Sequence, residues 1–153
     1  MIRARPEPRP LRGFAVEIPV RFAECDRYGV VWHGHYALYL EQAREALTGT
    51  FGFTATRALD LGYRVPITRM EIRYRQPILS DTTVRVTARL RPPAVARLVV
   101  DYEVRSAEGA QLATAETEQV VLNASGDLLL TFPALLADLV RRILEAQGPD
   151  GAE

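Results

Sequence analysis

The sequence predicts an α+β domain in which an antiparallel sheet of about five strands wraps around a central helix, with a second helix at the C-terminal end. Apolar residues recur at every second position in five segments, which is the period of a strand with one buried face. Mainly short turns join the last four segments, so the strands they form must be antiparallel. Between the first two segments, apolar residues recur at spacings of three and four, which is typical of an amphipathic helix. Such a helix can cover the apolar face of the sheet.

The length of the chain, 153 residues, suits one domain with its own core. Residues 1–13 are charged and interrupted by prolines, which block helix and sheet hydrogen bonding, so we expect a flexible arm there. We expect residues 14–146 to form the single domain and residues 147–153 to form a flexible tail.

The first strand and the central helix lie on either side of a polar turn. We expect the strand over residues 14–24, with alternating apolar positions at Val16, Ile18, Val20 and Phe22. After Gly34 the period changes, and an apolar stripe predicts a helix that ends near Gly49 and Gly52. The stripe consists of Tyr36, Leu40, Ala43 and Leu47.

The remaining elements follow in order along the chain. Alternation predicts strands over residues 63–78, 81–91, 96–106 and 110–127, the last of them bent. In the first of these, one face carries Met70, Ile72 and Tyr74, and the other carries Arg69, Glu71, Arg73 and Arg75. Gly109 suits a hairpin turn, and Pro133 suits the first turn of the C-terminal helix. The apolar side of that helix consists of Leu135, Leu136, Leu139, Val140, Ile143 and Leu144.

Charge and composition exclude several classes of function. The formal net charge is +0, which argues against nucleic acid or an anionic membrane as a partner. No apolar run approaches the roughly 20 residues that cross a bilayer, and the first residues lack the apolar part of a signal peptide. Cys25 is the single cysteine, which fits a reducing compartment. We therefore expect a cytoplasmic protein.

The stretch ECDRYGVVWHGHY, residues 24–36, concentrates the polar side chains that chemistry needs. His33 and His35 are two residues apart near a helix start, which makes a poor pair of metal ligands, so we expect no metal. The alternative for them is that His33 caps the helix entry and His35 lies partly exposed. We interpret Cys25 as a packing residue and Glu24 as structural.

Asp26 is the strongest candidate for chemistry in this stretch. It lies in a turn, beside Gly29, and a turn aspartate commonly bonds to its own backbone. The helix that begins seven or eight residues later offers free N–H groups that suit an oxyanion. A carboxylate facing that site is what hydrolysis of an activated acyl group needs. Further along the helix, Glu41 is either a carboxylate that pairs with Arg44 or a group that faces a partner.

The stretch VRFAECDRYGVVWHGHYALYLEQARE, residues 20–45, resembles the hotdog-fold acyl-CoA thioesterases of the 4-hydroxybenzoyl-CoA thioesterase family. The matching positions are Arg21, Glu24, Asp26, Gly29, Val30, Trp32, His33, Tyr36, Glu41, Ala43 and Arg44. A weaker resemblance in strand order covers roughly residues 14–132. The predicted sheet wrapped around one helix agrees with the hotdog fold.

The resemblance implies a function and a set of site residues. The catalytic carboxylate falls on Asp26, as nucleophile or general base, and the backbone N–H groups that polarise the thioester carbonyl fall on His33 and Gly34. The implied reaction hydrolyses a small aliphatic or aromatic acyl-CoA to the free acid and CoA, with no metal or cofactor. The substrate is acyl-CoA, with an acyl-carrier protein as a further option, and the assembly is a homodimer or homotetramer. Candidate substrate contacts are Tyr28, Gly29, Trp32, Glu41, Arg91 and Arg97.

Two alternatives and one departure accompany this interpretation. A hotdog domain can also be a non-catalytic module that binds acyl-CoA or acyl-carrier protein, but Asp26 disfavours that option. A hotdog dehydratase would use a histidine and a carboxylate on a helix, which His33 and Glu41 could imitate. The departure is His35, where the family usually has a small residue or asparagine, and we expect it to bear on acyl specificity.

Overall fold

A computed structural model describes residues 6–149. In chain order, its elements are β1 (Phe14–Pro19), the 3₁₀ turns η1 (Phe22–Glu24) and η2 (His33–His35), α1 (Tyr36–Gly49), α2 (Ala55–Asp60), β2 (Ile67–Tyr74), β3 (Thr83–Leu90), β4 (Arg97–Ser106), β5 (Gln111–Val120) and α3 (Ala134–Gln147). The five strands form one sheet in the order β1-β3-β4-β5-β2, and every neighbouring pair is antiparallel. The predicted α+β architecture is confirmed.

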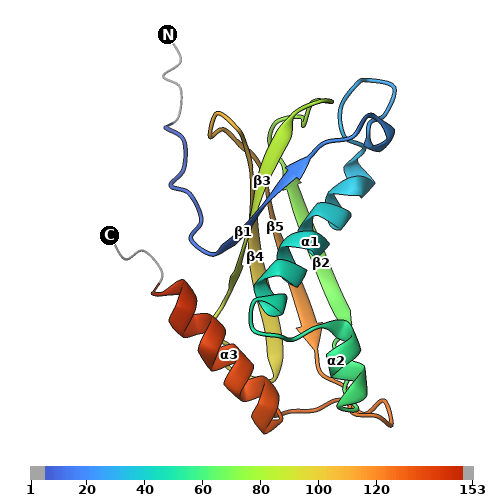
Figure 1. The fold of residues 1–153 in the computed structure, drawn as a ribbon, viewed down its shortest axis with the longest axis vertical. Helices are drawn as coiled ribbons and strands as arrows, with labels where there is room; N and C mark the ends of the chain where they lie inside the picture. The colour runs from blue at the N-terminus through green and yellow to red at the C-terminus, as the bar shows by residue number, and fades with distance from the viewer. Residues whose placement is uncertain (1–5, 150–153) are drawn as a thin grey trace.

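The central helix α1 lies across the concave side of the sheet and packs on β1 and β3 (Figure 1). All four residues of its predicted apolar stripe are buried, and Tyr39 beside them is buried too. They contact a core that includes Val86 and Tyr102 of the sheet. The burial of this stripe fixes the axis of α1 and therefore the place where its first turn lies.

The C-terminal helix α3 packs Leu136, Leu139, Val140 and Ile143 into the same core, whereas Leu135 of the predicted stripe is nearly half-exposed. Its last residue, Gln147, holds both the N–H and the carbonyl of Leu90 with its side-chain amide. The helix is thereby fastened to the end of β3. No helix within residues 6–149 is both long and apolar enough to cross a membrane.

The first strand is shorter than its apolar alternation predicts. It ends at Pro19, and the next residues turn into η1, so that Phe22 is 82% exposed instead of buried. The physical reason is the carboxylate of Glu24, whose Oε1 accepts a hydrogen bond from the Arg21 N–H at 2.8 Å. This cap closes a turn where the alternation alone would continue the strand.

Two further differences concern the later part of the chain. The last strand, predicted over residues 110–127, ends at Val120, and the chain then bends so that Leu122 bridges to Arg64 and Leu128. The short helix α2 was not predicted. Its signal was Thr54, whose hydroxyl accepts the Arg57 N–H in the manner of an N-cap.

The predicted arm, residues 1–13, makes ordered contacts in the part that the structure describes. The Leu11 N–H donates to Glu103 Oε1 at 3.0 Å, and Glu7 accepts the N–H of Gln111 at 3.2 Å. Arg105, which is paired with Glu103, donates to the carbonyl of Pro8. These contacts cover polar groups on the outer face of the sheet. Residues 1–5 and 150–153 of the predicted arm and tail lie outside the described residues, and the flexibility of both segments stays a prediction.

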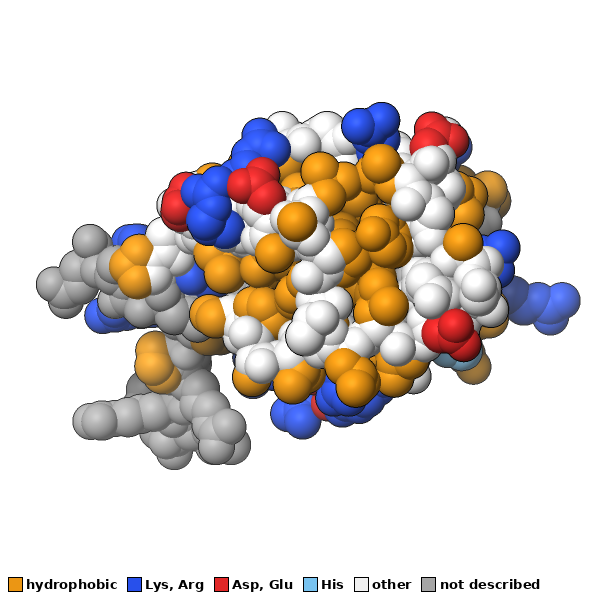
Figure 2. All heavy atoms as spheres, turned by 90° about the horizontal axis from the view of Figure 1, so that it is seen from below, with side chains coloured by type: hydrophobic (Ala, Val, Ile, Leu, Met, Phe, Trp, Pro, Cys, Tyr) orange, Lys and Arg blue, Asp and Glu red, His pale blue; other side chains and the backbone are white. Residues whose placement is uncertain are grey.

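Apolar side chains gather at the lower end of the molecule, where α2, the segment before α3 and the start of α3 meet (Figures 1 and 2). The exposed apolar residues of these elements include Leu59, Leu61, Leu128, Leu130 and Leu135. This end lies near the C-terminal end of α1, opposite the polar stretch at residues 24–36 (Figure 1). It is therefore separate from the candidate site.

We predict that Gly13→Ala lowers the stability of the fold. A Cβ at this position would lie 2.1 Å from the carbonyl oxygen of Ala88, so β1 would have to move away from β3. Overpacking of this kind costs about 1–3 kcal/mol, which thermal unfolding detects as a melting temperature several degrees lower. The matched control is Gly49→Ala, because a Cβ on Gly49 meets nothing within 4 Å and alanine favours a helix. Equal melting temperatures for the two variants would contradict this account of β1.

Candidate active site

A tight turn connects η1 to the start of α1 and holds Asp26 at its base. The Asp26 N–H donates to the Val30 carbonyl at 2.9 Å, and the Gly29 N–H donates back to the Asp26 carbonyl at 3.1 Å. Gly29 has φ +77°, a left-handed conformation that glycine adopts without steric cost. Val31 donates to Ile78 at 2.9 Å, which ties the turn to the segment before β3. Gly29 thus has a clear role in the turn, and its predicted contact with substrate stays a prediction.

The Asp26 side chain is half-buried and uses only one of its oxygens. Oδ1 accepts the Tyr28 N–H at 2.8 Å, which is the self-bonding turn that the sequence left open. Oδ2 accepts no hydrogen bond from any residue in the described range. The side chain opens into a cleft of about 610 Å³ lined by Phe22, Ala23, Glu24, Cys25, Asp26, Arg27, Trp32 and His35. A turn aspartate and a reactive carboxylate are therefore compatible here, because each uses a different oxygen.

The entry to α1 presents unused backbone donors. His33 and Gly34 are the first two residues of η2, and their N–H groups find no acceptor among residues 6–149. The Tyr74 hydroxyl donates to the His33 carbonyl at 2.8 Å and so holds this turn against β2. The His33 side chain makes no capping hydrogen bond, so the alternative that it caps the helix is wrong. Free N–H groups at a helix start suit an anion or a developing oxyanion.

Trp32 covers this entry and depends on Gly34. The indole lies over Gly34 so closely that a Cβ there would be 2.4 Å from the ring. The ring is half-exposed, and it lines the cleft that also contains Asp26. The absence of a side chain at Gly34 therefore allows the Trp32 ring to pack there. In this position, Trp32 can contact a ligand in the cleft.

A hydrogen-bond network around Glu24 is the part of the site that the sequence did not reveal. Glu24 Oε2 lies 3.0 Å from His35 Nε2, while Oε1 accepts the Tyr39 hydroxyl and the Arg21 N–H, each at 2.8 Å. Burial raises the pKa of Glu24, but the hydrogen bonds from Arg21, Tyr39 and His35 outweigh it and hold the pKa below its ordinary value. Burial, and next the bond to Glu24, raise the pKa of Tyr39. Glu24 is thus a carboxylate at neutral pH, and its interpretation as a structural residue agrees with these contacts.

Cys25 packs against the core and is partly buried, as its interpretation as a packing residue expects. Glu41 forms an ion pair with Arg44, which is the first of the two roles that the sequence left open for it. Glu41 is not among the residues that line the cleft. Its predicted contact with substrate stays a prediction.

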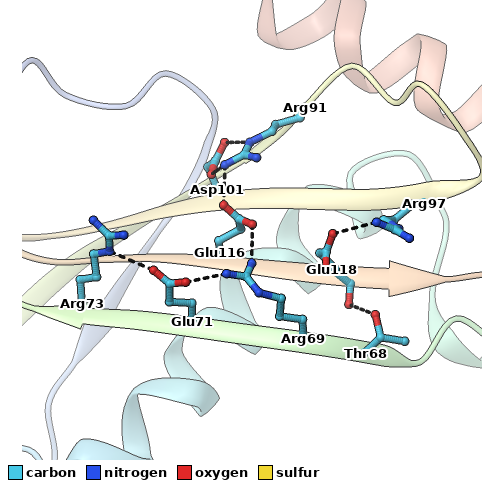
Figure 3. Close-up of polar contacts among 9 residues, drawn as sticks. All are labelled: Thr68, Arg69, Glu71, Arg73, Arg91, Arg97, Asp101, Glu116 and Glu118. Carbon is cyan, nitrogen blue, oxygen red and sulfur yellow. Dashed lines mark hydrogen bonds and ion pairs between the residues drawn. The ribbon is translucent and has the colours of Figure 1, made fainter.

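The structure does not bring Arg91 and Arg97 to the cleft. Both lie on the outer face of the sheet, where a network of ion pairs joins neighbouring strands (Figure 3). Arg91 binds both carboxylate oxygens of Asp101 at 2.7 Å and also Glu116, and Arg97 pairs with Glu118 at 3.3 Å. These carboxylates compete with any phosphate for the two arginines, and their contact with CoA stays a prediction.

Tyr28 lies at the tip of the turn and is 90% exposed. It is not among the residues that line the cleft, so its predicted contact with substrate also stays a prediction. Among residues 6–149, no three histidine, cysteine, aspartate or glutamate side chains are grouped so that they could hold a metal ion.

Comparison with known proteins gives concordant results. Residues 20–141 match the model of the thioesterase-like superfamily. A putative acyl-CoA thioesterase, YneP, of Bacillus subtilis is 36% identical over 62 residues, which cover 40% of this chain and 45% of that protein. The chain thus spans less than half the length of this relative. A 1,4-dihydroxy-2-naphthoyl-CoA hydrolase of Thermosynechococcus vestitus is 28% identical over 116 residues, 75% of this chain and 78% of that protein.

The fold has close counterparts among solved structures. A 1,4-dihydroxy-2-naphthoyl-CoA thioesterase from Synechocystis superposes with a TM-score of 0.77 at 21% identity, over 84% of this chain and 95% of that one. The predicted hotdog fold is confirmed by this likeness.

We predict that Glu24→Gln destabilises the protein at neutral pH but not in acid. A folded-state pKa below the ordinary 4.5 means that the Glu24 carboxylate stabilises the fold above that pH, and the contribution is lost as pH falls through the folded pKa. Hydrogen bonds to a charged group contribute about 1.5–3 kcal/mol. Urea unfolding of both proteins at a series of pH values from 7 downward measures this difference. A gap in unfolding free energy that is as large in acid as at neutral pH would contradict the carboxylate's role.

Proposed function

This chain belongs to the thioesterase-like superfamily, and from that premise we propose that it is an acyl-CoA thioesterase, which hydrolyses its substrate to a free acid and CoA. The proposal rests on two kinds of group that have no hydrogen-bond partner among residues 6–149. Asp26 has a free carboxylate oxygen in a cleft, and the N–H groups of His33 and Gly34 stand free at the helix entry that follows the same turn. Thioester hydrolysis needs both a carboxylate and an oxyanion site.

In the proposed reaction, the thioester carbonyl oxygen binds to the N–H groups of His33 and Gly34. The positive end of the helix dipole favours the negative charge that develops on that oxygen. Asp26 acts on the carbonyl carbon either as a nucleophile or through a water that it deprotonates. The thiolate of CoA leaves in both cases. His33 contributes through its backbone in this scheme.

We propose a small acyl group, with aromatic acyl groups as the first to test. Trp32, which is positioned by Gly34, lines the cleft and offers a face for ring stacking. The relative from Thermosynechococcus vestitus carries a name that specifies an aromatic acyl-CoA. A short aliphatic acyl group and an acyl group on a carrier protein are the other substrates to compare. A cytoplasmic location accords with Cys25 as the single thiol and stays a prediction.

We propose that two copies of this chain form a homodimer, which can pair further into a homotetramer. The inner face of the edge strand β2 is incompletely covered, because α1 packs on β1 and β3 at the other side of the sheet. Tyr74 is 50% exposed on that face, and Met70 is also accessible. Leu38 on α1 is exposed as well. A second copy would cover these apolar groups and the open edge of β2.

We predict that Asp26→Asn lowers kcat about a thousandfold or more without unfolding the protein. The measurement is release of free thiol from acetyl-, butyryl-, octanoyl- and benzoyl-CoA and from an acylated carrier protein, followed with a thiol reagent. The matched control is Asp60→Asn, which alters an exposed carboxylate on α2 and should leave turnover unchanged. Near-normal turnover by the Asp26 variant would remove Asp26 from the mechanism. Binding of acyl-CoA without thiol release by the natural chain would favour a non-catalytic module instead.

We predict that Met70→Arg converts the assembly to monomers, because a buried unpaired charge at an interface is strongly unfavourable. Light scattering at several protein concentrations measures the molecular mass. Leu59→Arg is the control, since it places the same charge on an exposed apolar position of α2. A natural chain that is monomeric at all concentrations would overturn the proposed dimer.

A further inference from the structure

His35 is a polar side chain of the cleft for which the proposed reaction has no role. Its imidazole lines the cleft together with Asp26 and Trp32, and it is 25% exposed. Its Nε2 lies 3.0 Å from Glu24 Oε2. A histidine held by a carboxylate inside a reaction cleft is the arrangement that general bases commonly use.

Glu24 is well suited to orient this histidine. Its other oxygen is held by the Arg21 N–H and the Tyr39 hydroxyl, each at 2.8 Å, so the carboxylate cannot turn away. An ionised carboxylate only accepts hydrogen bonds, so the network assigns the proton to Nε2 of neutral His35. The lone pair then lies on Nδ1, which has no hydrogen-bond partner in the described part of the chain. A tautomer fixed in this way leaves Nδ1 as a base.

Several other titratable or charged groups surround His35. Tyr39, one turn further along α1, meets its ring edge-on at 5.6 Å between centroids. From η1 and the turn, the titratable and charged groups that line the same cleft are Glu24, Cys25, Asp26 and Arg27. His35 is the only residue in this set whose side-chain type ordinarily changes charge between pH 5 and 8.

We propose that His35 is a second catalytic residue, which takes the proton of the hydrolytic water and leaves Asp26 free to act as the nucleophile. The inference rests on the proposed thioesterase function. A carboxylate that attacks the carbonyl carbon cannot also deprotonate the water that later releases the acyl group. His35, in the same cleft, supplies that second function.

In the proposed reaction, the acyl group passes from CoA to Asp26 and then to water. Asp26 attacks the carbonyl carbon, the C–S bond breaks, and its electron pair leaves with the sulfur of CoA as thiolate. The product on the enzyme is a mixed anhydride between Asp26 and the acyl group. A water then forms a C–O bond to the acyl carbon as its proton passes to His35 Nδ1, and the anhydride C–O bond breaks to restore the Asp26 carboxylate. The imidazolium returns the proton to the thiolate or to solvent.

The deciding experiment compares His35→Gln with His35→Ala. Glutamine can place an amide N–H close to the position of Nε2 and so keep the bond to Glu24, but it has no base. We expect both variants to lose about 10²- to 10⁴-fold in kcat. We expect the rise of kcat between about pH 5 and 8 to be absent in both. His35→Asn is measured in parallel as a smaller variant that also lacks a base, in case glutamine is not accommodated.

Rapid mixing with benzoyl-CoA, or with the best substrate of the acyl-CoA panel, gives the most specific readout. The natural chain should release CoA at a steady rate. His35→Gln should release about one CoA per active site in a fast burst and then continue slowly, because the anhydride accumulates. Tyr39→Phe removes one donor to Glu24 but keeps His35, and it should retain the pH-dependent rise of kcat.

Each outcome bears on the proposal. Near-normal kcat and an unchanged pH profile for His35→Gln would mean that the bond to Glu24 alone matters, and would overturn it. A slow variant without a burst would also overturn it, because His35 would then act at or before C–S cleavage. A natural chain that releases no thiol from any acyl-CoA would overturn the proposed function and this inference together. The first two results leave the thioesterase function standing, so the failures are distinguishable.

Discussion

The burial of α1 against the concave face of the sheet is the contact on which the arrangement of this molecule depends. Tyr39, Leu40 and Leu47 have almost no exposed surface, so the helix has one axis and one rotation on the sheet. Because α1 packs on β1 and β3, its first turn arrives beside the segment that leaves β1. The helix entry and the turn that holds Asp26 are joined there by the hydrogen bond from the Trp32 N–H to the Glu24 carbonyl. The same placement leaves the side of β2 uncovered, and so the core also determines where a second copy can bind.

Glu24 and Asp26 are only two positions apart, but their carboxylates have different hydrogen-bonding environments. Glu24 is saturated with donors from three directions, and it ties the end of η1 to the first turns of α1. Asp26 gives one oxygen to its own turn and keeps the other free. The hydrogen bonds of Glu24 hold the segment from which the Asp26 turn begins. Glu24 therefore stabilises the local structure, and Asp26 is the carboxylate that we propose to react.

The spacing of apolar residues in the sequence is sufficient to predict the sheet, α1 and most of α3, because side-chain burial repeats with the geometry of the backbone. Apolar spacing fails to predict the structure where a polar contact ends an element early. At Phe22, the hydrogen bond between Glu24 and the Arg21 N–H closes a turn and ends the strand. The pairing of Glu24 with His35 spans eleven residues and arises only when two turns meet, so no local pattern signals it. The ion pair between Arg91 and Asp101 is equally hard to predict from the sequence, because it depends on the register of β3 and β4. Asp26 could be singled out in advance because its spacing from a helix start is local.

The N-terminal arm has a consequence for the order in which the chain folds. Its bonds from Leu11 to Glu103 and from Glu7 to Gln111 join residues 92 and 104 positions apart. The arm is synthesised before its partners on β4 and β5, and closing such long loops costs chain entropy before any contact forms. We therefore expect the arm to dock after the β4–β5 hairpin has closed. A chain shortened at its N-terminus would still assemble the core around α1, and it would leave the Glu103–Arg105 pair open to water on the outer face of the finished sheet.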